Sequence, residues 1–182
     1  MRQRFFSVML LAALVGCSKS DSNPIIDFGE GEGITYRTAT NLPVGPRDYT
    51  DWTSDAEWNK QERALFSDLN FDLNGSQRTA LIGETTVYPN PAPGNLANWE
   101  LQLRQTGNNA PPLCITQAVM VNRKYEVLIR IPAFTSNYGI NYRFDYASLG
   151  LSPNELYRIY YVVYDTSGLI YKGHGDIRYS PQ

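Results

Sequence analysis

Hydrophobic and polar residues alternate over much of the chain beyond residue 95. In the stretches 99–104, 125–131 and 140–146, roughly every second residue is apolar or aromatic, and most residues between them are polar or charged. This period of two is typical of strands in a sheet that has one buried and one solvated face. The stretches 113–121 and 156–164 are more continuously apolar, which is typical of central strands.

Clusters of turn-forming residues separate these stretches. About seven short strands joined by such turns predict an antiparallel β-sandwich, and no alternation of strands with helices favours a parallel sheet. The turn clusters are Gly107-Asn108-Asn109, Asn137-Tyr138-Gly139, Ser152-Pro153-Asn154 and Asp165-Thr166-Ser167-Gly168. The sequence therefore predicts an all-β fold, with its folded domain spanning residues 51–182.

One short helix is expected before the strands. Ser54 and Glu57 have the spacing of a capping box, in which the serine side chain accepts from a backbone amide and the glutamate reaches back. Apolar residues then recur near one helical face, which predicts a helix over about 54–67. Trp52 and Trp58 are expected to dock this helix onto the sandwich.

The segment 17–50 is rich in glycine, proline and small polar residues. Such a composition has too little apolar surface to fold alone, so we expect a flexible tether that holds the domain away from a membrane. Within it, the short stretch 34–37 is compatible with one strand.

The N-terminus has the features of a lipoprotein signal peptide. Arg2 and Arg4 precede an apolar run from residue 5 to residue 16, which is shorter than the ~20 residues that span a bilayer. The run ends in Leu14-Val15-Gly16-Cys17, which resembles a lipobox and implies cleavage after residue 16 and lipidation of Cys17. Several acyl chains give stable membrane anchoring. The alternative is a soluble protein with an apolar N-terminal segment and an incidental cysteine.

The net charge and the number of cysteines limit the classes of binding partner and the disulfides that the chain can form. The formal net charge is −2, and no basic cluster points to nucleic acid as a partner. Lipidation of Cys17 would leave Cys114 without a disulfide partner, so Cys114 is expected to be a buried, unreactive thiol in a strand.

A weak calcium motif occurs at Asn70, Asp72 and Asn74, followed by glycine at the sixth position of an EF-hand-like loop. The match fails at its twelfth position, where Leu81 stands in place of glutamate. The favoured interpretation is a strand through residues 69–73 followed by an Asn-Gly turn. We therefore expect no metal and no cofactor.

His174 is the single histidine, and glycines flank it. Together with Asp176 it could form a base and its orienting acid, with Ser167 or Ser180 as the nearest hydroxyl. No nucleophile-elbow pattern accompanies these residues. A solvated hairpin turn is the favoured interpretation.

Tyrosines are concentrated in the second half of the chain. A dense run is formed by Tyr157, Tyr160, Tyr161 and Tyr164. Rings with a polar tip suit ordinary strand positions, and they also suit stacking on sugar rings or anchoring a protein partner. These four residues are the candidate ligand-binding residues of the sequence.

Short motifs resemble those of one bacterial lineage. Cys17-Ser18-Lys19-Ser20-Asp21 is similar to the start of Bacteroidota lipoproteins, and Val87-Tyr88-Pro89-Asn90-Pro91-Ala92 resembles the entry of Ig-like sandwich modules of that phylum, including sorting domains of type IX secretion. The stretch 163–168 is similar to their strand–turn. The resemblance implies an Ig-like sandwich and a lineage. Ser18, and not aspartate, follows the cysteine, so by resemblance nothing indicates retention in the inner membrane and an outer-membrane location, periplasmic or surface-exposed, is expected. The long gap between the motifs and the lack of a basic C-terminal ending speak against sorting by that system.

Three functions follow as hypotheses. The first is a non-catalytic cell-envelope lipoprotein that binds a protein or displays a module. The second is a glycan-binding lipoprotein that uses the tyrosine-rich face. The third is a hydrolase.

Overall fold

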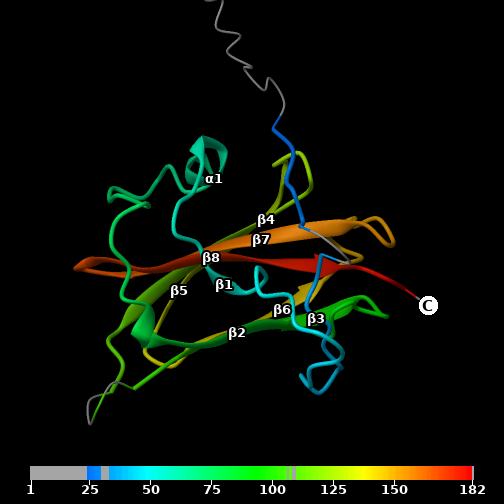
Figure 1. Ribbon diagram of the computed structural model, residues 1–182, viewed down its shortest axis with the longest axis horizontal. Coiled ribbons are helices and arrows are strands. Elements are labelled where there is room, and N and C mark those ends of the chain that lie inside the picture. Colours follow the sequence, from blue (N-terminus) through cyan, green and yellow to red (C-terminus); the bar gives the residue numbers. More distant parts are fainter. Residues whose placement is uncertain (1–23, 30–32, 106, 108–109, 182) are drawn as a thin grey trace, which may run out of the picture.

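Two antiparallel sheets pack face to face in the computed structural model (Figure 1). One sheet has five strands in the order β1-β8-β7-β4-β5, and the other has three in the order β2-β3-β6. The strands are β1 Thr53–Ser54, β2 Ile82–Tyr88, β3 Leu96–Leu103, β4 Cys114–Val121, β5 Val127–Ser136, β6 Gly139–Asp145, β7 Leu156–Asp165 and β8 Gly168–Arg178. This arrangement confirms the predicted all-β sandwich.

The structure describes residues 24–29, 33–105, 107 and 110–181. The predicted signal peptide 1–16, the lipidation site Cys17 and part of the turn 107–109 lie outside the described residues. Within the described part, no helix has the length and the apolar character needed to cross a bilayer.

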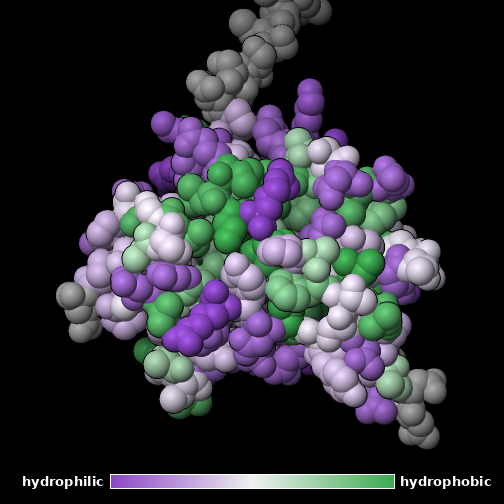
Figure 2. Space-filling view, turned by 180° about the vertical axis from the view of Figure 1, so that it is seen from behind, coloured by the Kyte–Doolittle hydropathy of each residue, from purple (hydrophilic) through white to green (hydrophobic). Residues whose placement is uncertain are grey.

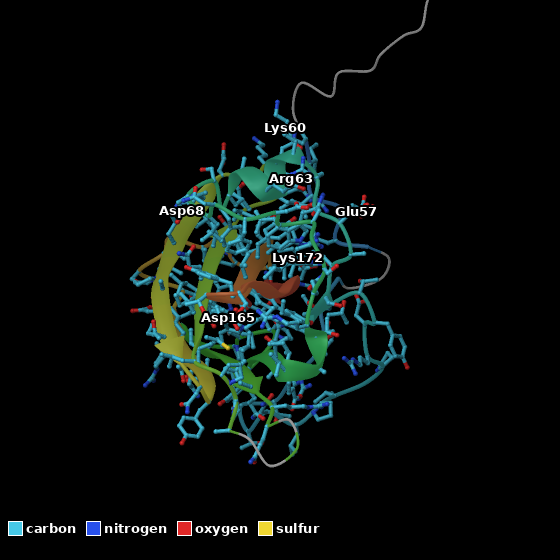
Figure 3. All side chains as sticks on the ribbon, turned by 90° about the vertical axis from the view of Figure 1, so that its left-hand side faces the viewer. Glu57, Lys60, Arg63, Asp68, Asp165 and Lys172 are labelled. Atoms are coloured by element: carbon cyan, nitrogen blue, oxygen red, sulfur yellow. The ribbon has the colours of Figure 1, made fainter. Side chains whose placement is uncertain are left out.

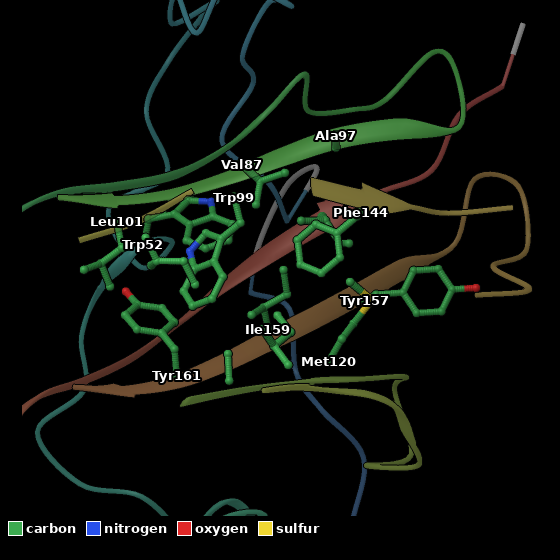
Figure 4. Packing of buried hydrophobic residues seen from close by; sticks show 14 of the residues in the cluster. Trp52, Val87, Ala97, Trp99, Leu101, Met120, Phe144, Tyr157, Ile159 and Tyr161 are labelled. Carbon is green, nitrogen blue, oxygen red and sulfur yellow. The ribbon is translucent and has the colours of Figure 1, made fainter. Parts of the chain in front are cut away.

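The main core lies between the two sheets (Figure 4). Trp99 of β3 is completely buried against Tyr161 of β7, with ring centroids 5.6 Å apart. Phe144 of β6 and Ile159 of β7 belong to the same cluster. Large aromatic side chains from both sheets thus contribute to the apolar surface that joins them.

A second core covers the outer face of the five-stranded sheet. Tyr160 and Val162 of β7 point into it, whereas Ile159 and Tyr161 point between the sheets. The short helix α1, Lys60–Ala64, lies over this outer face in Figure 1. Both faces of β7 are therefore buried, which explains its continuously apolar sequence.

The helix differs from its prediction over 54–67. Asn59 caps α1: its Oδ1 atom accepts from the Glu62 amide at 3.0 Å, and Glu62 Oε2 accepts from the Asn59 amide at 2.7 Å. Ser54 lies instead in β1 and pairs with Gly173. The predicted capping box was therefore wrong because the same motif occurs five residues later, at Asn59. Trp58 packs beside the helix in the outer core, as expected, whereas Trp52 lies in the core between the two sheets and does not dock the helix.

Parts of the described segment before residue 51 pack on the sandwich, whereas most of residues 39–50 are exposed. Ile26, Phe28 and Ile34 are buried, and the Ile26 amide donates to the carbonyl of Arg123 at 2.8 Å. The Phe28 ring lies 5.2 Å from the guanidinium carbon of Arg158. Packing on the sandwich thus begins before the predicted boundary at residue 50, because the apolar side chains of residues 26, 28 and 34 are buried.

Hydrophobic residues also reach the surface. Figure 2 shows them gathered near the middle of the face opposite to that in Figure 1, with hydrophilic residues around and between them. Val127 and Phe134 lie exposed on β5, which pairs only with β4 among the described strands. Pro132 and Arg130 in β5 are features that protect an open sheet edge.

Candidate functional site: an arginine-lined cavity

A polar cavity of about 280 Å³ lies between the N-terminal segment and the sandwich. Its walls come from four separate parts of the chain: the segment 35–52, the start of β2, Arg104 after β3, and Tyr171 of β8. The cavity is therefore a product of the tertiary structure, and no continuous motif encodes it.

Three arginines line the cavity: Arg37, Arg47 and Arg104. Arg37 Nη2 donates to Glu84 Oε1 at 2.7 Å, and Arg37 Nη1 donates to the carbonyl oxygen of Asn41 at 3.0 Å. Its Nε atom is buried and has no hydrogen-bond partner. In the described part of the chain, neither Arg47 nor Arg104 forms an ion pair with a carboxylate. The cavity thus contains two solvent-exposed arginines that form no direct ion pair within the described residues.

Asp51 is the buried acid of the cavity, with 1% of its surface exposed. Its Oδ2 atom accepts from the Thr35 amide at 2.6 Å and its Oδ1 atom from the Asp176 amide at 2.6 Å. Burial, followed by the charge of Asp176, raises the pKa of Asp51 to about 7, although the two amides act in the opposite direction. The Asp51 carboxyl group therefore changes its charge near neutral pH.

Trp52 adopts an unusual backbone conformation at the cavity. Its φ angle is 58°, which is uncommon for a bulky residue. The Trp52 amide donates to the His174 carbonyl at 3.0 Å, while the indole Nε1 atom is buried without a partner. Strained residues of this kind cluster at binding and catalytic sites, where surrounding contacts hold them in place.

A β-bulge shapes the opposite wall. The register between β2 and β3 shifts between Ile82 and Thr85, and the intervening Gly83 and Glu84 line the cavity. A Cβ atom on Gly83 would lie 3.2 Å from the carbonyl oxygen of Gln102, so glycine allows the two strands to approach. Bulges redirect side chains next to functional sites.

Asn90 holds the N-terminal wall in place. Its Nδ2 atom donates to the carbonyls of Thr35 at 3.2 Å and Asp176 at 2.9 Å, and its Oδ1 atom accepts from the Arg178 amide at 3.1 Å. Its backbone also pairs with Arg37 through two hydrogen bonds. The proline-flanked asparagine that the sequence singled out thus joins residues 35–37 to β8.

The four tyrosines proposed as ligand contacts do not form a surface. Tyr157, Tyr160 and Tyr161 are buried, and Tyr164 is half-buried against Phe71, with ring centroids 5.2 Å apart. The interpretation of these residues as an exposed stacking face was wrong. They belong to β7, which is covered on both sides.

The weak calcium motif is a turn. Asn74 Oδ1 accepts from the Trp58 amide at 2.8 Å and from Lys172 Nζ at 3.1 Å, so a cationic group already occupies this ligand oxygen. Figure 3 shows Lys172 in the interior, whereas Lys60 and Arg63 lie near the surface. Residues 69–73 are not a strand. The Asn-Gly turn itself is confirmed.

His174 lies inside β8 and not in a turn. The favoured interpretation of this stretch was therefore wrong. Its Nδ1 atom lies 2.8 Å from Asp55 Oδ2, whereas Asp176 bonds Arg158 through both carboxylate oxygens, each at 2.7 Å. The predicted pairing of His174 with Asp176 is absent. The flanking glycines serve packing, since a Cβ on Gly173 would lie 2.3 Å from the Thr53 carbonyl oxygen.

Cys114 is buried, as expected from the sequence. Its thiol lies 3.2 Å from the Pro112 carbonyl oxygen, and burial raises the pKa of this thiol. Both features disfavour the reactive thiolate form.

The arginine-lined cavity was missed by the sequence analysis. Its only sequence signal was indirect: Asn90, in the proline-flanked motif, holds one wall. Comparisons with protein-family models, with curated proteins and with solved structures give no match for this chain.

Proposed function

We propose that this protein is a lipid-anchored, non-catalytic binding protein of the cell envelope, most simply of the outer membrane, and that its ligand occupies the arginine-lined cavity. The basic start, short apolar run and lipobox-like end of residues 1–17 support the anchor. The cavity supports the binding function.

One observation carries the binding proposal. Arg37 Nε and Trp52 Nε1 are both buried donors without a partner, and both residues line the same cavity. A buried donor left unpaired costs roughly 1–3 kcal/mol, and natural proteins keep few of them. Neither atom is exposed to the cavity, so the proposal requires that binding of a ligand with acceptor oxygens moves one of these side chains into contact with it.

The state of Asp51 favours binding over proton-transfer chemistry. Both of its oxygens already accept from backbone amides, which fixes the carboxyl group as part of the wall. The His174–Asp55 pair belongs to the β1–β8 contact, and neither residue lines the cavity. A general base would need to lie within hydrogen-bond reach of a bound substrate.

The anchor is tested by metabolic labelling. A bacterial host expressing the full-length chain is fed an alkyne-bearing fatty acid, and the chain is examined for label and membrane association. Wild type and the control Cys114→Ala should be labelled and membrane-bound. Cys17→Ala should lose both properties. Label that persists in Cys17→Ala would refute the proposed anchor.

Binding is tested with full-length protein purified in mild detergent and presented to a panel of glycans and small metabolites. Arg104→Gln removes one cavity charge, and Arg143→Gln is its matched control on an exposed position of β6. The proposal requires at least one ligand whose binding weakens in Arg104→Gln and not in Arg143→Gln. A panel without any ligand, or equal effects of the two variants, would reject the cavity as the site.

A further inference from the structure

We infer that the cavity selects ligands that carry one negative charge on a sugar-sized ring, the class of uronic acids and sugar sulfates. This inference rests on the proposed function and deepens it. It follows from three properties of the cavity: the state of its charged groups, its net charge and its size.

The acids of the cavity are engaged by the protein itself. Glu84 pairs with Arg37 at 2.7 Å, and Asp51 accepts from two backbone amides. Arg47 and Arg104 have no carboxylate partner among the described residues. Two guanidinium groups are thus left to meet a ligand, and each presents a planar fork that matches a carboxylate or sulfate group.

The balance of charges favours a monoanion. Three arginines face Glu84 and Asp51 in the same walls, so the cavity has a net charge of about +1 when both acids are ionised. A dianion would be attracted by the arginines but repelled by Glu84, and also by Asp51 in its ionised form. A ligand with one charge can contact Arg47 and Arg104 without an uncompensated second charge.

The size of the cavity limits the ligand to about one ring. Its volume of about 280 Å³ is at the lower end of small-molecule sites, which begin near ~300 Å³. Trp52 and Tyr171 contribute little surface to the cavity, because each is only 6% exposed, and the remaining polar walls suit a ring that carries hydroxyl groups. The ring can come from a free sugar acid or from one unit of an acidic glycan, because the recognised group is the same.

Calorimetric titration of the full-length protein in detergent tests the inference. The ligands are glucuronate, glucose 6-sulfate, glucose and inorganic phosphate at constant ionic strength, with an oligosaccharide of glucuronate as a separate arm. Glucuronate or the sulfate should bind about tenfold or more tightly than glucose, because a charged hydrogen bond contributes more than ~1.4 kcal/mol. Comparison of the free acid with the oligosaccharide distinguishes the two sources.

Arg47→Gln and Arg104→Gln should each weaken binding of the acid by about tenfold, and should weaken glucose binding much less, because glucose carries no charge. Arg143→Gln should change neither. Thermal unfolding of each variant verifies that the fold is retained.

Two outcomes overturn the charge inference and leave the proposed function standing: equal affinity for glucose and glucuronate, or phosphate as the tightest ligand. Absence of binding in every arm, together with silence across the wider ligand panel, overturns both.

Discussion

Gly175 of β8 lies directly against the indole ring of Trp52: a Cβ atom built on this glycine would lie 2.2 Å from the ring. Trp52 has a left-handed backbone conformation at the cavity, and its ring fills the space beside Gly175. Because Gly175 has no side chain, the indole ring of Trp52 can occupy the space beside it.

Gly175→Ala should therefore push the indole ring away. We expect the free energy of unfolding to fall by about 1–3 kcal/mol, as for other overpacked cores, together with a changed near-ultraviolet circular dichroism spectrum. Gly94→Ala is the matched control, because a Cβ at Gly94 meets no atom within 4 Å. Equal stability of the two variants would contradict the close contact.

Asn90→Ala removes three side-chain hydrogen bonds from a buried position. The carbonyls and the amide that it leaves unpaired should lower the free energy of unfolding by about 1–3 kcal/mol, as measured by urea denaturation. Ligand binding in the cavity should weaken as well, because residues 35–37 lose their attachment. Asn141→Ala, at an exposed position of β6, should change neither measurement.

Asp51 should make stability depend on pH. Its folded pKa of about 7 lies above its ordinary value of 3.8, so the folded state retains a proton that the unfolded state has lost. The contribution of Asp51 to stability is complete at low pH and is lost as the pH rises through this window. The full window is worth about 4 kcal/mol.

Unfolding free energies at about pH 5 and about pH 8 test this sign. Asp51→Asn cannot ionise, so its stability relative to wild type should improve by roughly 2–4 kcal/mol between these values. The exposed Asp68→Asn serves as control. Parallel curves for wild type and Asp51→Asn would show that the carboxyl group does not titrate in this range.

Phe28→Ala tests whether the N-terminal segment belongs to the folded domain. Phe28 is buried and lies between the guanidinium groups of Arg123 and Arg158. Its truncation should lower the free energy of unfolding by about 3–5 kcal/mol and expose residues 24–50 to proteolysis. Ile25→Ala, at a residue with 64% of its surface exposed, should resemble wild type. An equal effect of the two variants would contradict the packed segment.

The sandwich was predictable because alternation along β3 and β6 directly reflects one buried and one more exposed face. The hairpin turn between β7 and β8 was equally visible in residues 165–168. These signals are local, since each strand or turn carries its own pattern.

The cavity and the burial of the tyrosines depend on distant contacts. Tyr160 is covered by Trp58, which lies about a hundred residues earlier in the chain, and no pattern within β7 reveals this cover. Likewise, the glycines beside His174 indicate a turn locally, whereas their real role is to admit Trp52 and Thr53. A glycine that is required because a Cβ atom would not fit leaves no periodic signal in the sequence.

The order of the chain gives the packed N-terminal segment a mechanical consequence. Ile26 and Phe28 precede the cavity wall at residues 35–37, and the Arg158 side chain donates to the Asp27 carbonyl at 3.0 Å between them. If Cys17 carries the lipid, a force that pulls the domain away from the membrane acts on the contacts of residues 26–28 before it reaches the cavity wall. The domain could then move on its anchor while the cavity keeps its shape.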